Sequence, residues 1–302
     1  MKIFSGTSNK FLAERIAKKL NLTLSPLEIH IFPDKEKRIR LLDSVVNQHT
    51  VLVQSTSTPA DENYMELFFI ADALKRNGAK SVTAVIPYLG YQRQDHMFRE
   101  GEAVSLQVII ETLQAVGVNR LIGFDFHTIR VPELFRIPVS DLSALPLFAE
   151  RIKKENWRKD DTMLIAPDMG GQRRIKLLSE MLGGMTYCAI EKNRDLATGE
   201  VTAEEIKEDV KKRALIVDDM ISSGGTIITA ANLLLRKGVE EIYVFATHPV
   251  FSDAAAEVLQ GSGVQKVFVT DSIYVPEQKQ FRKLNILSIS KMVAKEIKTP
   301  WV

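Results

Sequence analysis

The sequence predicts an α/β protein whose sheets are mainly parallel and flanked by helices. Short β-branched runs such as 49–55 alternate with longer helical patterns such as 60–78, where apolar residues recur at spacings of three and four. This strand–helix–strand rhythm is typical of βαβ units, which build parallel sheets. The rhythm pauses at 135–146, a stretch with two prolines, and then resumes. The pause divides the chain into two predicted domains.

Each further element follows from the same patterns. The N-terminal run 1–11 is expected to form a strand and turn, and Gly117 is expected to close a helix. The other expected strands are 81–88, 120–126, 162–168, 185–192, 213–219, 241–249 and 265–271, and the other expected helices are 104–117 and 172–182. The predicted domains are 1–145 and 146–286, and we expect 287–302 to pack back on the first.

Composition narrows the class of protein. The chain has 302 residues, 45% of them hydrophobic, which suffices for a substantial core. Because 40 Lys and Arg residues nearly balance 38 acids, no nucleic-acid partner is expected. No apolar run approaches the roughly 20 residues that cross a bilayer, so we expect no membrane association. A single cysteine, Cys188, fits a reducing cytoplasm.

The stretch 214–235 holds the first candidate site. An apolar run ends in Asp218 and Asp219, and small residues then lead into a helical pattern. Backbone N–H groups and hydroxyls at a helix N-terminus bind phosphate without a formal positive charge. A serine-capped turn would explain the small residues alone. The acids point to a ligand, since adjacent carboxylates repel unless something satisfies them. The turn consists of Ser222, Ser223, Gly224, Gly225 and Thr226.

Four other segments carry polar residues at or near predicted strand ends, where ligands of parallel α/β sheets bind. Each alone also fits an ordinary turn, surface loop or structural histidine. In one segment, Asp168 precedes a glycine turn whose backbone could approach a pyrophosphate closely. In another, two cationic residues follow a strand and enter a polar loop. The residues concerned are Asp168, Gly170 and Gly171; Lys192 and Arg194; Arg93, Gln94 and Asp95; and His127.

Two resemblances make these segments specific. "LIVDDMISSGGT" is similar to the signature of type I phosphoribosyltransferase folds, so both domains are expected to be phosphoribosyltransferase-like. Together with "FPDKEKRIR", "VIPYLGYQRQD", "DFHT", "APDMGG", "EKNR" and "ATHPVFS", it resembles the ribose-phosphate pyrophosphokinase family over nearly the whole chain. Several of these motifs are particular to that family and are not shared by base-transferring relatives.

The resemblance implies a reaction and a role for each residue. ATP and ribose 5-phosphate would give AMP and phosphoribosyl pyrophosphate, with Mg²⁺ as cofactor and a homo-oligomer of dimers, possibly a hexamer, as assembly. For the sugar phosphate, the resemblance implies that Asp218 and Asp219 bind the ribose hydroxyls, that Ser222 to Thr226 bind the 5-phosphate, and that Gly170 and Gly171 line the pyrophosphate region. It implies Mg²⁺ sites at His127 and Asp168 and binding of the transferring group by Lys192 and Arg194. The residues implied to bind ATP are Arg93, Gln94 and Asp95, together with Phe32, Asp34, Lys35 and Glu36 from a neighbouring subunit.

The sequence also departs from the family pattern. Lys35 replaces a glycine that often serves a positive φ, Ser222 stands where many bacterial members carry a third Asp, and His96 stands where a basic residue is common. Two alternatives stay open: a base-transferring phosphoribosyltransferase, and a catalytically silent regulatory subunit. Assembly, phosphate or nucleotide regulation, donor preference and the group that removes the ribose O1 proton are not assigned.

Overall fold

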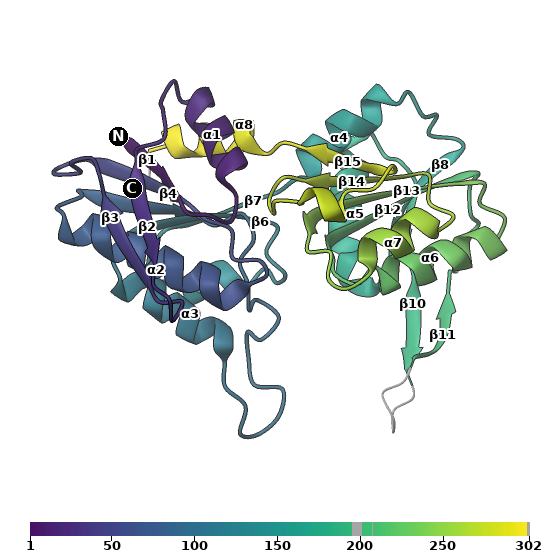
Figure 1. Cartoon of the computed structure of the whole chain (residues 1–302). Helices are drawn as coiled ribbons and strands as arrows, with labels where there is room; N and C mark the ends of the chain where they lie inside the picture. Colours follow the sequence, from purple (N-terminus) through teal and green to yellow (C-terminus); the bar gives the residue numbers. More distant parts are fainter. Residues whose placement is uncertain (195–200, 207, 301–302) are drawn as a thin grey trace. The chain divides into compact units, whose positions relative to one another are not determined.

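The structure, a computed structural model, describes residues 1–194, 201–206 and 208–300, and of residues 192–194 and 201–204 it describes the backbone alone. The chain splits into two compact units (Figure 1). The first comprises Met1–Leu142, Ser272–Tyr274 and Ser288–Val302, and the second Ser143–Asp271 and Val275–Leu287. We describe each unit by itself.

The first unit is built on a parallel sheet with the strand order β1-β4-β5-β6-β7. Helices α2 and α3 lie on one side of this sheet, and α1 packs beside α8 on the other (Figure 1). The hairpin β2–β3 packs against α2. The bounds are β1 Lys2–Ser5, α1 Lys10–Lys19, β2 Leu27–Ile31, β3 Lys37–Leu41, β4 His49–Val53, α2 Ala60–Arg76, β5 Ser81–Val85, α3 Ser105–Ala115, β6 Arg120–Phe124, a 3₁₀ turn Val131–Leu134, β7 Val139–Leu142 and α8 Ser290–Lys298.

The second unit has a parallel sheet with the order β15-β14-β13-β12-β8-β9, and the antiparallel hairpin β10–β11 extends from it (Figure 1). The bounds are α4 Leu145–Lys154, β8 Thr162–Ala166, a 3₁₀ turn Met169–Gly171, α5 Gln172–Met181, β9 Tyr187–Ala189, β10 Glu191–Arg194, β11 Val201–Glu205, β12 Arg213–Ile221, α6 Gly225–Arg236, β13 Glu241–Pro249, α7 Ala255–Gly261, β14 Lys266–Thr270, a 3₁₀ turn Glu277–Lys279 and β15 Leu284–Leu287.

Strand β12 shows why the predicted strands are apolar at nearly every position. Ala214 and Ile216 belong to the core cluster that includes α6 and α7, whereas Leu215 and Val217 belong to the cluster that includes α4 and α5. Successive side chains of a strand point to opposite faces, and both faces of a parallel sheet are covered by helices. Asp218 and Asp219 therefore interrupt this apolar pattern within the strand, which continues to Ile221.

The predicted fold class is confirmed, and one predicted strand is wrong. The stretch 135–146 also holds a strand that was not predicted: β7 begins directly after Pro138 and pairs in parallel with β6. Proline lacks the N–H that a strand interior needs, but it is tolerated at a strand's start. The expected strand 185–192 is two strands, since β9 joins the main sheet and β10 pairs with β11 instead.

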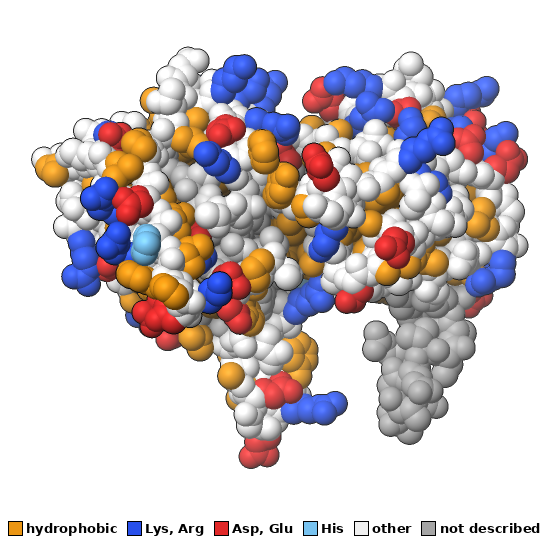
Figure 2. Space-filling model, in the orientation of Figure 1, with side chains coloured by type: hydrophobic (Ala, Val, Ile, Leu, Met, Phe, Trp, Pro, Cys, Tyr) orange, Lys and Arg blue, Asp and Glu red, His pale blue; other side chains and the backbone are white. Residues whose placement is uncertain are grey.

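The surface mixes charges of both signs. Figure 2 shows acidic and basic side chains interspersed over the face that it draws. Among the described residues, no helix has both the length and the apolar character that a membrane span requires.

Candidate active site

The loop between β12 and α6 has the geometry of an anion site. Gly224 caps the helix with φ +83°, a left-handed conformation that side chains rarely adopt, and Ile228 N donates to its carbonyl at 3.0 Å. Ser223 and Thr226 are exposed beside this helix N-terminus. The first turn of α6 therefore offers backbone N–H groups and exposed hydroxyls at a helix N-terminus, as phosphate sites do.

The adjacent acids lie just before this loop and share a cation. Strand β12 continues to Ile221, so Asp218 and Asp219 lie within the strand rather than at its end. Arg174 of α5 approaches both: its guanidinium lies 3.5 Å from Asp218 Oδ1 and 4.0 Å from Asp219 Oδ2. Burial and the neighbouring Asp219 carboxylate nevertheless raise the pKa of Asp218 well above its usual value. Both acids thus lie near one guanidinium, just before the anion loop.

The loop after β8 lies beside this pair because β8 and β12 are neighbours in the sheet. Asp168 caps the short turn Met169–Gly171, its Oδ1 accepting from Gly171 N at 3.3 Å. A Cβ on Gly171 would lie 3.0 Å from Ala166 Cβ, so this position has little room for a side chain. The glycine therefore lets α5 begin close to the sheet, which brings Arg174 to the acids.

Ser222 has a partner on the next strand's loop. Its Oγ lies 3.0 Å from Ser252 Oγ, and Ser252 N donates to Ser222 O at 3.2 Å. Phe251, directly before Ser252, is buried and has a φ of +42°. The segment "ATHPVFS" thus braces the anion loop from β13, a role that its sequence did not indicate.

In the first unit, residues 32–36 form the tip of the hairpin β2–β3. Phe32 N donates to Glu36 O at 2.8 Å, Lys35 N to Phe32 O at 2.9 Å, and Glu36 N to Asp34 Oδ1 at 3.1 Å. Lys35 has a φ of +75°, so lysine keeps the left-handed turn instead of adopting another. That conformation costs a non-glycine residue about 1–2 kcal/mol. All of these side chains are exposed at the hairpin tip.

Residues 93–95 follow β5 and lie against the segment that follows β6. Thr128 Oγ1 donates to Asp95 Oδ2 at 3.2 Å, and Gln92 Oε1 accepts from His127 N at 2.8 Å. Although burial acts to raise it, hydrogen bonds with His96 and Thr128 hold the pKa of Asp95 below its ordinary value. The structure thus joins two of the predicted segments within one unit.

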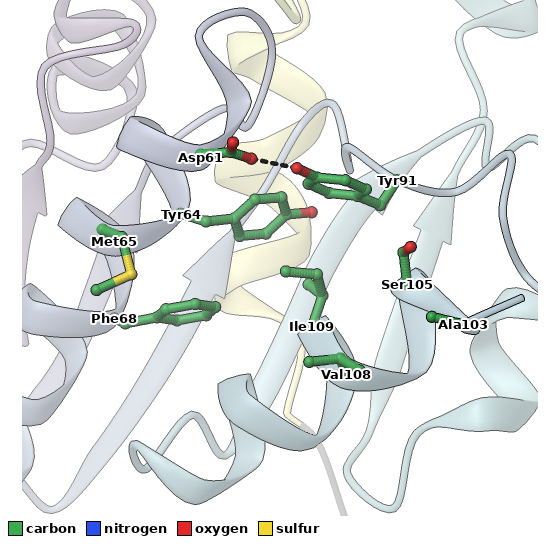
Figure 3. A pocket seen from close by; sticks show the side chains of 9 residues that line it. All are labelled: Asp61, Tyr64, Met65, Phe68, Tyr91, Ala103, Ser105, Val108 and Ile109. Carbon is green, nitrogen blue, oxygen red and sulfur yellow. Dashed lines mark hydrogen bonds between the residues drawn. The ribbon is translucent and has the colours of Figure 1, made fainter.

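Side chains of Tyr91 and Gln94 hold the rest of the loop after β5 in place. Tyr91, whose φ is +61°, donates its hydroxyl to Asp61 of α2 (Figure 3). Gln94 Nε2 lies 3.3 Å from Glu102 Oε2 and 3.3 Å from the Ala103 carbonyl. Tyr91 also walls a cavity of about 300 Å³ between α2 and α3 (Figure 3). Its remaining lining residues are Tyr64, Met65, Phe68, Ala103, Ser105, Val108 and Ile109, with Asp61 at the rim.

Lys192 and Arg194 lie in strand β10, not in the loop that we expected. Their backbones pair with Glu204 and Val201 of β11, with an irregular register at Asn193 and Arg194. A hairpin that leaves the main sheet can carry charged residues away from the core. Their side chains lie outside the described part of the chain.

Comparison with known proteins identifies the family. Residues 1–117 match the N-terminal domain of ribose phosphate pyrophosphokinase, and residues 199–300 match the phosphoribosyl synthetase-associated domain. A ribose-phosphate pyrophosphokinase of Fusobacterium nucleatum is 38% identical over 98% of this chain and 94% of its own. One from Aquifex aeolicus is 37% identical over 99% and 95%.

The chain belongs to the ribose-phosphate pyrophosphokinase family. The crystal structure of phosphoribosylpyrophosphate synthetase from Mycobacterium smegmatis has a TM-score of 0.92 to it, with 32% identity over 98% of this chain and 97% of that one. Neither the base-transferring nor the regulatory alternative is favoured by these relatives.

The structure places two residues at the candidate site, Arg174 and Gln92, that the sequence analysis did not single out. Arg174 lies in the first turn of α5, where nothing in the sequence distinguishes it from Arg173. Gln92 is 1% exposed, although it directly precedes the predicted nucleotide-binding residues 93–95. A polar loop sequence does not show which of its side chains is buried. In both cases the missing information was the direction of the side chain.

The metal residues that the family resemblance implies do not form a complete site by themselves. Among the described residues, no group of three or more His, Cys, Asp or Glu side chains could hold an ion. Mg²⁺ typically keeps several waters and binds through one or two carboxylates plus substrate phosphates. Asp168, a half-buried carboxylate that caps the turn Met169–Gly171, fits that donor set.

Proposed function

We propose that this chain transfers the β,γ-diphosphoryl group of ATP to O1 of ribose 5-phosphate, releasing AMP and phosphoribosyl pyrophosphate. The observation that carries the proposal is one strand, β12, that presents a carboxylate pair and then an anion loop. A ribose 5-phosphate offers hydroxyls that suit the acids and a phosphate that suits the loop. Family membership supports the synthetase reaction over base transfer.

The second unit would bind the sugar phosphate. Ser222 to Thr226 bind the 5-phosphate through backbone N–H groups and hydroxyls at the α6 N-terminus. Asp218 and Asp219 accept hydrogen bonds from ribose hydroxyls, which replaces repulsion between the acids with charge-assisted bonds. Gly170 and Gly171 line the region where the new pyrophosphate forms.

The first unit would bind ATP. Arg93, Gln94 and Asp95 contact the nucleotide, and a guanidinium both stacks on rings and pairs with phosphate. The hairpin tip contacts the adenine and ribose of ATP that is bound in a neighbouring subunit of a homo-oligomer. The residues of the tip are Phe32, Asp34, Lys35 and Glu36. The exposure of this tip supports a role in contact with something outside its own unit.

Catalysis would rest on positioning and charge. Asp168 and His127 would each serve an Mg²⁺ site together with substrate phosphates, and the metal would neutralise charge on the transferring group. Lys192 and Arg194 place cations where negative charge develops, which is the main requirement of phosphoryl transfer. The ribose O1 attacks directly, so no covalent nucleophile is needed.

We place the enzyme in the cytoplasm.

The function is tested by incubating purified chain with ATP, Mg²⁺ and ribose 5-phosphate and separating the nucleotides. We expect AMP to form in proportion to ribose 5-phosphate added. Absence of AMP at every metal and phosphate concentration would favour the regulatory alternative. Consumption of phosphoribosyl pyrophosphate together with a nucleobase, without formation of AMP from ATP, would favour base transfer.

Asp218→Asn should weaken ribose 5-phosphate binding without destabilising the free protein. Hydrogen bonds to a charged group contribute about 1.5–3 kcal/mol, so we expect affinity to fall at least about tenfold by calorimetry. Because burial and Asp219 already disfavour the Asp218 carboxylate, its removal should leave the melting temperature unchanged or higher.

The matched control is Asp161→Asn. Asp161 also faces an arginine, with its Oδ1 3.3 Å from Arg213 Nη1, but it lies before β8 at the opposite end of the strand. This variant should bind ribose 5-phosphate like the wild type. Unchanged affinity in Asp218→Asn would contradict the assignment of the carboxylate pair to the sugar.

A further inference from the structure

Gln92 is a buried side chain that the proposed site does not yet use. It lies between Tyr91 and Arg93, yet it is only 1% exposed, whereas both neighbours are exposed. Its Oε1 accepts a hydrogen bond of 2.8 Å from the backbone N–H of His127. The two residues are 35 positions apart in the chain. Gln92 therefore connects the loop after β5 to the loop after β6.

This connection crosses the place where the nucleotide segment and His127 meet. A second bond, from Thr128 Oγ1 to Asp95 Oδ2 at 3.2 Å, links the same two loops. Two bonds between short loops fix both the separation and the relative orientation of their backbones. Gln92 holds the loop at the residue directly before Arg93, and it grips the backbone of His127 itself.

The other end of the Gln92 side chain is inconsistent with a purely stabilising role. Within the described part of the chain, its buried Nε2 has no hydrogen-bond partner. Leaving a buried polar group unpaired destabilises the folded state, which offsets what the bond to His127 contributes. An apolar side chain of similar length would avoid this cost. The amide is therefore expected to contribute little to stability while fixing the His127 loop.

We propose that Gln92 is a positioning residue that sets the place of His127 relative to the nucleotide segment Arg93–Asp95. The inference rests on the proposed function, because it assigns Gln92 to the synthetase reaction through those residues. Gln92 does not touch the reacting groups. It acts through the backbone of His127, and a displacement of about 1 Å in such a group can lower turnover about 100-fold.

The test is Gln92→Met in the full chain, since methionine has a similar length and offers the His127 N–H only the weak acceptor of a thioether sulfur. We expect the His127 amide to exchange with deuterated water at least about tenfold faster, because its bond to Oε1 is lost. Turnover of ATP should fall about tenfold or more, with the KM for ribose 5-phosphate within about twofold of wild type. The melting temperature should change by less than about 4 °C.

Asn119→Leu is the matched control, because Asn119 Oδ1 accepts from Val82 N at 2.8 Å at the opposite end of β5 and β6. It removes the same kind of bond without touching the site, so its turnover should stay near wild type. Gln92→Glu, which keeps an acceptor, should restore the slow exchange of the His127 amide. Thr128→Val tests the second link should Gln92→Met not fold, and it too should lower turnover.

Three results would overturn the inference. One is full turnover in Gln92→Met, and another is unchanged exchange at His127. The third is a loss of turnover that matches a loss of melting temperature in both Gln92→Met and Asn119→Leu, which would make the role structural. Absence of AMP formation in the wild type would instead contradict the proposed function itself.

Discussion

Lys192→Ala should lower kcat by about 100-fold or more while ribose 5-phosphate affinity stays within about twofold of wild type. One preorganised donor to a developing charge typically contributes a factor of about 100–1,000 to kcat. Its removal leaves the anion loop of α6 intact, because that loop belongs to a different segment of the second unit. Steady-state AMP formation and calorimetry with ribose 5-phosphate measure the two quantities separately.

Lys212→Ala supplies the control for this experiment. Lys212 makes an exposed ion pair of 2.9 Å with Glu240, so its replacement removes the same charge from the same unit. Surface pairs of this kind contribute little, and both kcat and affinity should stay near wild type. Turnover of Lys192→Ala within a few-fold of wild type would show that Lys192 does not supply the catalytic cation.

Glu66→Ala should destabilise the protein by about 3–5 kcal/mol, the largest stability effect that we expect from one side chain. Glu66 is 0% exposed on α2 and accepts from Lys37 Nζ at 2.9 Å, Thr7 N at 2.6 Å and Gln54 Nε2 at 3.1 Å. Removing one partner of a buried ion pair leaves the other charge without compensation. The change is measured as a lower midpoint in urea unfolding.

The exposed pair on the same hairpin provides the comparison. Glu28→Ala breaks contacts of 3.3 Å with Arg38 and 2.8 Å with Arg40, all partly or largely exposed, and should cost less than about 1 kcal/mol. Because Lys37 starts β3, the Glu66 cluster also ties the hairpin tip Phe32–Glu36 to α2. A loss of less than about 1 kcal/mol in Glu66→Ala would mean that Lys37 finds water when Glu66 is gone.

The parts of the fold that the sequence predicts are those with a long apolar period. Strands such as β12 and helices such as α2 bury continuous or regularly spaced apolar residues, and their positions agree with prediction to within a few residues. The hairpin β2–β3 and the strand β7 were not predicted. Both are half-buried and short, so each strand has only four or five residues in which a pattern can show.

The candidate site divides along similar lines. Its local part, the strand–loop–helix unit with Gly224 at positive φ, is fixed by neighbouring residues, so the sequence alone indicates it. Contacts between distant segments were out of reach. Arg174 meets Asp218 across 44 residues and Gln92 meets His127 across 35, and no local signal shows where such side chains point.

Lys35 illustrates the limit of a departure from a family pattern. The sequence allowed two outcomes, a strained turn or a different one, and the structure has the strained turn with a φ of +75°. The hydrogen bonds of the hairpin tip outweigh the local cost of the left-handed lysine. Backbone strain of this kind persists where the surrounding structure determines it and often marks functional segments.

The most direct test of the central claim follows the β-phosphorus of ATP. With ATP carrying a distinguishable label at that phosphorus, phosphorus NMR should show the label bonded to O1 of ribose in the product, with unlabelled AMP as the other product. This result requires transfer of the intact β,γ-diphosphoryl group. Label found in ADP, or ATP left intact in the presence of ribose 5-phosphate and Mg²⁺, would contradict the account.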